Sequence, residues 1–427
     1  MLNEKLLSAI WQYKIFKRYP LSTINGKLVE IIHPGEKNNN AGPDFLNARI
    51  KIDTILWAGN IEIHQKTSDF LKHQHHLDKN YHSLILHLVY EHDSPISLPF
   101  PIEVIELKNF ISESTIQQYQ SLTQDKKAPT CINLWDSLEN IYIQNWLNRL
   151  AIERLEKKYL QIKQFFDTTK DYQETFYRLF CRHLGFKVNN DTFEKLSEKI
   201  PLKILLKHTD CLNIVEALIY GTAGFLNKAF KDSYLLHLQN EFEFLKKKYS
   251  IHPIYVHLWK FATMRPQNFP SLRLHQLALF IHYFPQMFHD PANFFLNKEQ
   301  LEKLHIQPEG YFKNHLTFDE DKFVNKTYHF GETSLQLLLI NVIVPYLFFY
   351  GKSTADEKYQ DLALHYLEHI PAENNHIIKK FYPPAKQFNT ALHSQALLEL
   401  YPNYCENKRC TECNIGIKII SQASKDF

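Results

Sequence analysis

The fold of the N-terminal region is decided by residues 42–66, GPDFLNARIKIDTILWAGNIEIHQK. Apolar and polar residues alternate along 45–52 and again along 55–64, across a short polar break. Alternation with a period of two is typical of β-strands with one buried face, and the short break favours an antiparallel pair. Asp44 then precedes one strand and Glu62 lies near the end of its neighbour, so strand pairing can bring the two carboxylates together.

The segments on both sides of this pair complete an expected element order of αβββαβ. Amphipathic spacing predicts a first helix, β-branched residues after an Asn-Gly turn predict a strand, and the polar stretch 35–42 predicts a loop. Downstream, a Ser-Asp start predicts a helix and a continuous apolar run predicts a buried strand. The expected elements of this order are a helix over 3–17, strands over 27–33, 45–52 and 55–64, a helix over 68–81, and a strand over 83–90. One further strand is expected beyond them, over 102–107.

Glu62, His64 and Lys66 fall on one face of their strand, because side chains alternate between the two faces of a sheet. Two carboxylates and a basic group on adjoining strands can hold one or two Mg²⁺ or Mn²⁺ ions, polarise a scissile phosphate and activate a water for in-line attack. The pattern therefore predicts hydrolysis of phosphodiester bonds in DNA or RNA. The alternative is structural, with Asp44 capping a turn and Glu62 pairing with a nearby cation.

The Pro-Asp dipeptide ending at Asp44 and the Glu62-x-His64 pattern, in this element order, resemble the PD-(D/E)XK nuclease superfamily. The resemblance implies an α+β protein with a restriction-endonuclease-like αβββαβ core and a mixed sheet, followed by a mainly α-helical C-terminal domain. It assigns the metal-ligating acids to Asp44 and Glu62, and an auxiliary glutamate to Glu4 on the first helix. His64 occupies the position of the superfamily's usual lysine, so Lys66, two residues further on the same face, is a second candidate for that role. A nuclease fold kept for binding, without catalysis, is a further alternative.

Nearly the whole chain is similar to an uncharacterised bacterial family of unknown function, whose members join this N-terminal region to a helical C-terminal part. This second resemblance implies no activity, so the functional expectation depends on the nuclease superfamily alone. The residues that carry it are Gly42-Pro43-Asp44-Phe45, Gly59-Asn60-Ile61-Glu62-Ile63-His64, Ser68-Asp69, His73-x-His75, Asp78-x-x-Tyr81, Leu86-His87 and Asp93.

Histidines crowd the same region and offer a different kind of metal site. Neutral imidazoles are common Zn²⁺ ligands, so two or three of them together with Asp44 could form the mononuclear centre of a zinc hydrolase. His73 and His75 are also candidates for contacting a substrate phosphate or for holding the loop that carries Lys66. His87 lies in an apolar run and fits a hydrogen-bonded core position better than a ligand position. The histidines concerned are His64, His73, His75, His76, His82, His87 and His92.

Three cysteines near the end of the chain, Cys405, Cys410 and Cys413, have the spacing Cys-x4-Cys-x2-Cys. This compact spacing can clasp a tetrahedral Zn²⁺ ion or one face of an iron–sulfur cluster. Cys131 could supply the missing fourth ligand across space, and ordinary free thiols are the alternative. Six cysteines in a chain of this length do not form the pattern of a secreted disulfide scaffold.

The 427 residues exceed one typical hydrophobic core, so several domains are expected. We expect a nuclease-like domain over 1–110, an α-helical domain over 111–400 and a cysteine-containing cap over 401–427. The net charge of +3 is too small to indicate nucleic-acid binding by itself, so a surface for nucleic acid must be local. In the helical domain, Arg265 and Arg273 are candidates for binding substrate phosphates, because arginine suits bidentate contact.

The sequence has no N-terminal signal pattern and no uninterrupted apolar run of the roughly 18 residues that a membrane span requires. The nearest candidate is Leu337–Tyr350, which contains Asn341 and Pro345 and is expected to be a buried helix. We therefore expect a cytoplasmic protein whose partner is DNA or RNA and not a membrane.

Overall fold

The computed structural model describes residues 3–95, 102–124, 127–262, 264–319, 324–325, 328–382 and 387–424. The chain divides into two compact units. Unit 1 comprises Met1–Leu150, Asn374–Gln387 and Ala396–Phe427, and unit 2 comprises Ala151–Glu373 and Phe388–Gln395. Unit 1 contains the β-sheet and unit 2 is mainly helical, so the protein is of the α+β class. The domain bounds at residues 110 and 400 stay a prediction.

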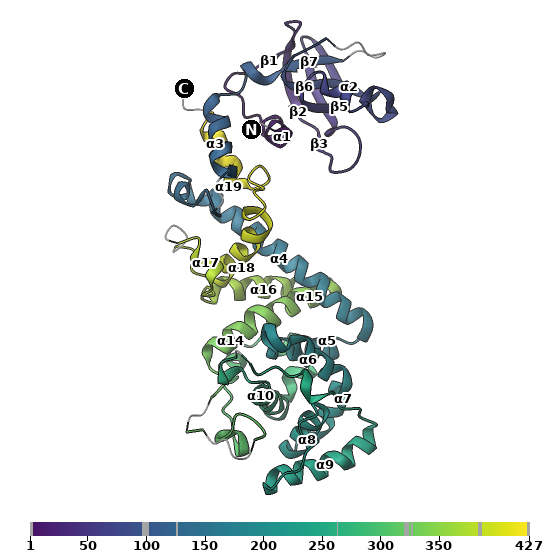
Figure 1. The fold of residues 1–427 in the computed structure, drawn as a ribbon, viewed down its shortest axis with the longest axis vertical. Coiled ribbons are helices and arrows are strands. Elements are labelled where there is room, and N and C mark those ends of the chain that lie inside the picture. Colours follow the sequence, from purple (N-terminus) through teal and green to yellow (C-terminus); the bar gives the residue numbers. More distant parts are fainter. Residues whose placement is uncertain are drawn as a thin grey trace. The chain divides into compact units, whose positions relative to one another are not determined.

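A seven-stranded mixed sheet forms the core of unit 1 (Figure 1). Its strands are β1 (Leu21–Ser22), β2 (Leu28–His33), β3 (Glu36–Lys37), β4 (Phe45–Ile52), β5 (Ile55–Lys66), β6 (Leu84–Glu91) and β7 (Glu103–Glu106). β1, β2, β4 and β5 pair antiparallel in that order, β3 pairs with β4, and β6 and β7 continue from β5 in parallel. A hydrogen bond of 2.9 Å from the Ile24 backbone N–H to the Val104 carbonyl bridges the two ends, so the sheet nearly closes into a barrel.

Helix α1 (Glu4–Tyr13) covers part of this sheet and contacts β5. It begins after Asn3, whose side chain accepts a hydrogen bond of 3.0 Å from the Leu6 backbone N–H and so satisfies one of the free donors of the first turn. Its buried face includes Trp11, which is fully buried. The helix stops before the expected limit at residue 17, because Lys14 adopts the left-handed conformation at φ 53°.

The prediction of one helix over 68–81 is wrong. Gln74 adopts a left-handed conformation at φ 61°, which interrupts helical hydrogen bonding after a single turn. The Asp78 side chain then accepts a hydrogen bond of 2.9 Å from the Asn80 backbone N–H and starts a separate turn. The segment consists of the short helix α2 (Asp69–Lys72) and two 3-10 turns, His75–Leu77 and Lys79–Tyr81.

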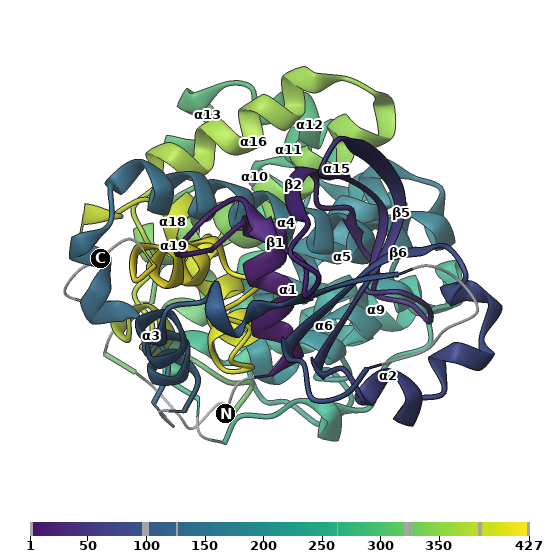
Figure 2. The same ribbon diagram turned by 90° about the horizontal axis from the view of Figure 1, so that it is seen from above.

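The C-terminal segment belongs to unit 1 although it is far from the sheet in sequence. Helix α3 (Glu113–Gln124) and helix α19 (Asn414–Gln422) lie side by side (Figures 1 and 2), and the Ser114 hydroxyl donates a hydrogen bond of 2.7 Å to the Ala423 carbonyl. At the other end of this pair, the Asn3 side-chain amide donates to the Tyr119 hydroxyl at 2.8 Å. Unit 1 therefore joins the start of the chain to its end. It also contains the short helix α17 (His376–Lys379).

Unit 2 is a set of helices around an aromatic and aliphatic core. Its helices are α5 (Tyr172–Leu184), α6 (Phe186–Lys199), α7 (Leu202–Leu205), α8 (Leu212–Thr222), α9 (Ser233–Tyr249), α10 (Pro270–Tyr283), α11 (Pro285–His289), α12 (Pro291–Phe294), α13 (Lys298–Glu302), α14 (Glu332–Leu338), α15 (Val344–Thr354) and α16 (Glu357–His369), while α4 (Asn140–Thr169) and α18 (Ala391–Leu400) contribute residues to both units.

One described helix, Glu332–Thr354, is long and apolar enough to cross a membrane. It consists of α14, a π-helical turn over Leu339–Ile343, and α15. Inside the protein, 72% of its most apolar window is buried, as expected for the core helix predicted around Leu337–Tyr350.

Candidate metal centre

Asp44 and Glu62 meet where the pairing of β4 with β5 ends. The last paired residues are Phe45 and Ile61, so the next backbone groups of β5 have no partner on β4. The Asp44 carboxylate accepts a hydrogen bond of 2.9 Å from the Ile63 backbone N–H, and the Asp44 backbone N–H donates to the Glu62 carboxylate at 3.1 Å. Each acid is thus held by the other's strand, and the structure brings together the two carboxylates on which the nuclease hypothesis depends.

Burial of this acid pair raises both of its pKa values. The pKa of Glu62 rises to about 9, first because of burial and then because of repulsion by Asp44. The pKa of Asp44 rises to about 6, again mainly through burial, although the hydrogen bond from the Ile63 backbone opposes the shift. Two carboxyl groups in such a place either keep a proton or need a cation.

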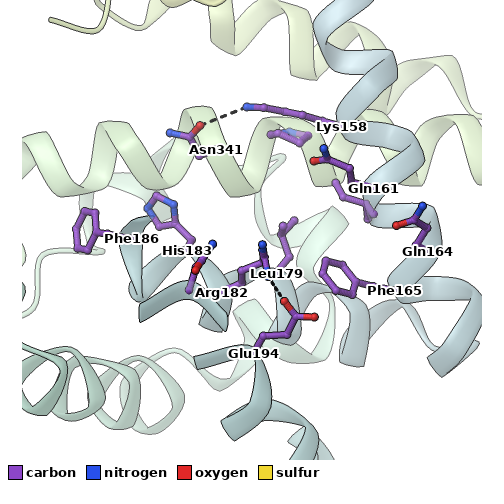
Figure 3. Close-up of a pocket in the computed structure, with 13 residues that line it drawn as sticks. Lys158, Gln161, Gln164, Phe165, Leu179, Arg182, His183, Phe186, Glu194 and Asn341 are labelled. Carbon is purple, nitrogen blue, oxygen red and sulfur yellow. Dashed lines mark hydrogen bonds and ion pairs between the residues drawn. The ribbon is translucent and has the colours of Figure 1, made fainter. Parts of the chain in front are cut away.

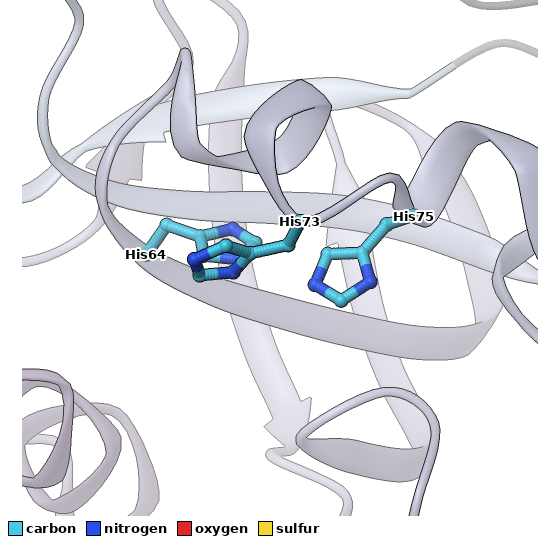
Figure 4. A group of neighbouring side chains, drawn as sticks. All are labelled: His64, His73 and His75. Carbon is cyan, nitrogen blue, oxygen red and sulfur yellow. The ribbon is translucent and has the colours of Figure 1, made fainter.

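Three histidine rings converge on one another (Figure 4), and two of them lie beside the Glu62 carboxylate. His64 shares a face of β5 with Glu62, and the irregular segment after α2 brings back His73 and His75. His64 Nε2 lies 3.2 Å from His73 Nδ1 and 3.6 Å from Glu62 Oε1, and His75 Nε2 lies 3.3 Å from Glu62 Oε1. The ligand atoms of the three histidines all lie within 4.8 Å of one another. We call Asp44, Glu62, His64, His73 and His75 the carboxylate–histidine cluster.

His87 stands behind this cluster and orients one of its rings. It lies opposite Glu62 in the parallel pairing of β5 with β6, and its Nε2 is 2.9 Å from His64 Nδ1. Burial lowers the pKa of both His64 and His87 to about 3, so both imidazoles are neutral at pH 7. When His64 Nδ1–H donates to His87, the lone pair of His64 Nε2 points toward His73 and Glu62. His87 is thus a core histidine, as expected, and it acts as a positioning residue for His64.

The cluster is buried on one side and accessible on the other. Glu62 and His64 are buried, His75 is half-buried and His73 is exposed. The three imidazole nitrogens form a donor set of the kind that binds transition-metal ions, and the Glu62 carboxylate lies beside two of them. An exposed ligand leaves room for water or a substrate on the open side, as catalytic sites require.

Glu4 and Lys66, the other two predicted catalytic residues, differ in their relation to the cluster. Glu4 on α1 accepts a backbone hydrogen bond from Gln65, and its negative charge contributes to the raised pKa values of Asp44 and Glu62. Lys66 is exposed at the end of β5, and its charge acts on Asp93 instead. Glu4 is therefore part of the electrostatic surroundings of the cluster, while Lys66 is not.

Lys37 is a cation near Asp44 that sequence reasoning missed. It lies on β3, opposite Phe45 in register, and its charge lowers the pKa of Asp44, though less than burial raises it. The polar stretch around it was expected to be a loop, so its pairing with β4 was not anticipated. The signal in the sequence was a basic residue shortly before the Pro-Asp dipeptide.

Arg265 and Arg273, the predicted phosphate-binding arginines, lie in unit 2. Arg265 is exposed, but Arg273 is only 2% exposed, and its guanidinium donates to Gln276 and Asn268 at 2.8 Å each. The same group packs over the ring of Phe186 at 4.7 Å. Arg273 is therefore a buried structural cation and does not face a solvent-accessible substrate.

Unit 2 contains a cavity of about 560 Å³ that no sequence pattern indicated (Figure 3). Lys158 lines it and donates to the Asn341 side chain at 3.3 Å and to Gln395 at 3.2 Å. Burial lowers the pKa of Lys158 to about 7. A second missed group lies on α16, where His365, Glu368 and His369 have ligand atoms within 4.8 Å of one another; its His-x-x-Glu-His spacing was the signal.

Cys131, Cys405, Cys410 and Cys413, the four cysteines predicted to form a second site, all belong to unit 1 and are free thiols. The Cys410 thiol lies 3.8 Å from the Leu122 carbonyl, which also accepts a hydrogen bond from Thr130, the neighbour of Cys131.

The fold and the cluster define a mixed α+β protein with a candidate metal centre on its sheet. The chain belongs to the family described as "Protein of unknown function (DUF2851)", whose model matches residues 4–376. This confirms the predicted membership of a family of unknown function. No curated protein and no solved structure matches the chain. The matched range contains the whole carboxylate–histidine cluster and Cys131, and it ends before Cys405.

Proposed function

We propose that unit 1 is a metal-dependent nuclease that hydrolyses phosphodiester bonds of DNA or RNA at the carboxylate–histidine cluster. One observation carries the proposal. Where the pairing of β4 with β5 ends, the Asp44 backbone N–H donates to the Glu62 carboxylate and the Ile63 backbone N–H donates to the Asp44 carboxylate, and three histidine nitrogens lie close together beside this acid pair. The raised pKa values of the acid pair indicate a place where a cation can take over the role of the bound protons.

The order and pairing of the elements support a restriction-endonuclease-like core for this unit. A helix, α1, precedes the antiparallel strands β2, β4 and β5, and a connection containing α2 leads to the parallel strand β6. The acids lie where such a core would carry them, at the start of one central strand and near the end of the next. The histidine in place of the usual lysine is accommodated as a metal ligand in this proposal.

The donor set favours Mn²⁺ or Zn²⁺ over Mg²⁺. Imidazole suits transition metals, whereas Mg²⁺ prefers oxygen ligands in a near-ideal octahedron. Spacings of 3.2–3.6 Å between neighbouring ligand atoms fit donors that share one ion. A bound ion would polarise the scissile phosphate and lower the pKa of a coordinated water.

The chain's own residues supply the remaining parts of the proposed reaction. His87 fixes the ring of His64 through the contact of 2.9 Å, so the ligand nitrogen is held in place before a metal arrives. Asp44, the half-buried acid with a pKa of about 6, would accept a proton from the attacking water. Lys37, exposed on β3 beside Asp44, would attract the phosphate.

The test is cleavage of single- and double-stranded DNA and RNA by metal-stripped full-length protein, to which Mg²⁺, Mn²⁺ or Zn²⁺ is added. We expect cleavage with Mn²⁺ or Zn²⁺ that Asp44→Asn abolishes, while the exposed control Asp136→Asn keeps it. Cleavage that persists in Asp44→Asn, or that needs no metal, would rule out the proposed site.

A second candidate function is a zinc hydrolase with a different substrate, which the convergence of His64, His73 and His75 favours. One tightly bound Zn²⁺ per chain without cleavage of any nucleic acid would support this candidate over the nuclease. Binding of nucleic acid without cleavage and without metal would instead support a non-catalytic binding module.

A further inference from the structure

A second group of potential metal ligands lies in unit 1, apart from the carboxylate–histidine cluster. Cys131 immediately precedes a 3-10 turn over Ile132–Ser137, Cys405 ends a π-helical turn, and Cys413 immediately precedes α19, with Cys410 in the loop between the last two. These four residues are the cysteine cluster. All are free thiols, and they come from two segments of the chain that are far apart in sequence.

Hydrogen bonds at the end of α3 tie the two segments together. The Leu122 carbonyl accepts a hydrogen bond of 2.7 Å from the Thr130 hydroxyl, next to Cys131, and also a contact of 3.8 Å from the Cys410 thiol. On the other side, Gly416 lets α19 approach this loop closely. A Cβ at that position would lie 2.2 Å from the Cys410 carbonyl oxygen, so no other residue fits without displacing Cys410.

The two segments meet at their cysteines, because the Cys410 thiol and Thr130, the neighbour of Cys131, share the Leu122 carbonyl. Burial raises the pKa of all four, and the presence of Cys131 raises the pKa of the other three further. The pKa of Cys410 rises to about 11 and that of Cys413 to about 12. Without a cation, the four cysteines are therefore neutral thiols. When a cation binds, the thiols release their protons and become thiolate ligands.

Lys408 supplies an independent sign that an anionic group belongs there. It adopts a left-handed conformation at φ 52°, and its Nζ is buried with no hydrogen-bond partner within the described part of the chain. Lys408 lies between Cys405 and Cys410 in the chain, and its charge lowers the pKa of Cys131, Cys405 and Cys410. A buried ammonium without an acceptor is costly, and four thiolates around a metal core provide the missing negative charge.

The spacing of the sulfur atoms separates two kinds of metal centre. A single Zn²⁺ with Zn–S bonds of about 2.3 Å would bring neighbouring sulfurs to about 3.8 Å. In the part of the chain that the structure describes, no three of these sulfurs lie within 4.8 Å of one another. A cubane places its own irons and sulfides between the ligands and holds the thiolates farther apart.

We propose that Cys131, Cys405, Cys410 and Cys413 bind a [4Fe–4S] cluster, with Lys408 as its buried counter-charge. With all four positions taken by protein ligands, the cluster is structural: it joins the segment after α3 to the C-terminal segment. The backbone N–H groups of Ile415 and Gly416, at the start of α19, hydrogen-bond the Cys413 sulfur and stabilise its thiolate. This inference does not depend on the proposed nuclease activity.

The test is anaerobic purification of the full chain from iron-supplied cells, followed by iron, zinc and acid-labile sulfide analysis and visible absorption. We expect about four iron and about four sulfide per chain, with the broad visible absorption of an iron–sulfur cluster. Cys410→Ser and Cys131→Ser should lose the iron and the absorption, while Cys211→Ser, in unit 2, should keep both. Glu62→Gln should also keep both, which separates this proposal from the nuclease proposal.

Lys408→Met provides a readout that does not depend on losing a ligand. This variant should keep its iron, and its cluster should have a more negative reduction potential, because a positive charge beside the cluster favours the reduced state. One zinc per chain with no sulfide would overturn the iron–sulfur assignment. Full iron content in Cys131→Ser would overturn the four-cysteine ligand set.

Discussion

The carboxylate–histidine cluster and the cysteine cluster lie in the same unit but are built in different ways. The first combines two residues of strand β5 with Asp44, just before β4, and with two histidines of the irregular segment after α2, and neighbouring ligand atoms lie 3.2–3.6 Å apart. The second gathers its ligands from turns and a helix start, and no three of its described sulfurs come within 4.8 Å of one another. The cluster anchored on the sheet has the spacing of one ion, while the cysteine cluster leaves room for a larger group.

The two clusters also differ in exposure and donor type. His73 is exposed, so the carboxylate–histidine cluster has an open side where a substrate can bind. In the cysteine cluster all ligands are partly or fully buried and all are sulfur. Open sites with mixed donors are typical of catalysis, and closed sites with four protein ligands are typical of structural roles. Under the two proposals, unit 1 carries a reactive centre and a separate stabilising one.

The largest effect is expected for Glu62, whose carboxylate contacts His64, His75 and the Asp44 backbone. Glu62→Gln removes a charged ligand oxygen while keeping the shape of the side chain. We expect kcat/KM for metal-dependent cleavage to fall about 1,000-fold, or about 4 kcal/mol. The exposed control Glu30→Gln on β2 should leave it unchanged. Steady-state assays on the substrate that the wild type prefers would decide, and an unchanged kcat/KM in Glu62→Gln would remove Glu62 from the mechanism.

The next effect concerns stability and belongs to the cysteine cluster alone. Cys131→Ser should prevent the cluster from joining the two segments, at a cost of about 3 kcal/mol, because a group that binds only the folded state stabilises it. A loss of that size corresponds to a fall in Tm of about 10 °C for a unit of this size. Anaerobic thermal unfolding measures it, with Cys211→Ser as the control. Equal Tm values for the two variants would contradict a stabilising role.

A smaller effect is expected from the positioning residue behind His64. His87→Phe keeps the buried volume but removes the nitrogen 2.9 Å from His64 Nδ1. Loss of such a partner weakens metal affinity about 10- to 100-fold, and we expect this range for Mn²⁺ or Zn²⁺ by isothermal titration calorimetry. His33→Phe on β2 is the matched control. If His87→Phe binds metal as tightly as the wild type, His87 is only a core residue.

The pH dependence of stability should identify the acid pair in the metal-free protein. Because the folded-state pKa of Glu62 is raised to about 9 from 4.5, the folded state binds more protons than the unfolded state within this window. The contribution of Glu62 to the free energy of unfolding should therefore fall as pH rises, by at most about 1.4 kcal/mol per pH unit. His64, with its pKa lowered to about 3 from 6.5, contributes with the opposite sign below pH 6.5, and Lys158, with its pKa lowered to about 7 from 10.5, contributes with the opposite sign above pH 7. The difference in slope between the wild type and Glu62→Gln isolates the contribution of Glu62.

Denaturant unfolding at pH 7, 8 and 9 would measure this slope. Glu62→Gln should make the slope more positive than in the wild type, because the amide does not titrate, and saturating metal should have the same effect in the wild type. An identical slope in Glu62→Gln and the wild type would show that Glu62 does not keep its proton in the folded state.

The smallest effect is expected at the surface. Lys37→Gln should raise KM about fivefold, or about 1 kcal/mol, with little change in kcat, because Lys37 attracts the substrate and does not contact the reacting bond. Lys51→Gln, an exposed lysine on β4, is the control. A KM that changes equally in both variants would indicate a general charge effect and not a local one.

The sequence was sufficient where a local pattern determines the structure. The alternation over 45–52 and 55–64 predicted β4 and β5 because a half-buried strand imposes a period of two. The helix expected over 68–81 failed because the left-handed Gln74 and the turn capped by Asp78 override local helical spacing.

The candidate site was predicted in part, for a similar reason. Asp44 and Glu62 could be placed together from strand pairing alone. The sequence could not tell which of His64 and His87 faces the other histidines. Both lie in strands, and only the register between β5 and β6 shows that His87 contacts His64 from the side away from Glu62. Lys66 was predicted as the basic residue of the site and Lys37 was missed. The pairing of β3 with β4 involves only two residues of β3, which is too short to produce an alternating pattern in the sequence.

The most direct test of the metal centre is anomalous diffraction from crystals of the protein grown with Mn²⁺ or Zn²⁺, recorded at the absorption edge of the added metal. We predict a peak about 2.0–2.2 Å from one ring nitrogen each of His64, His73 and His75. Bound metal elsewhere in the crystal with no peak between these three side chains would contradict the proposed centre.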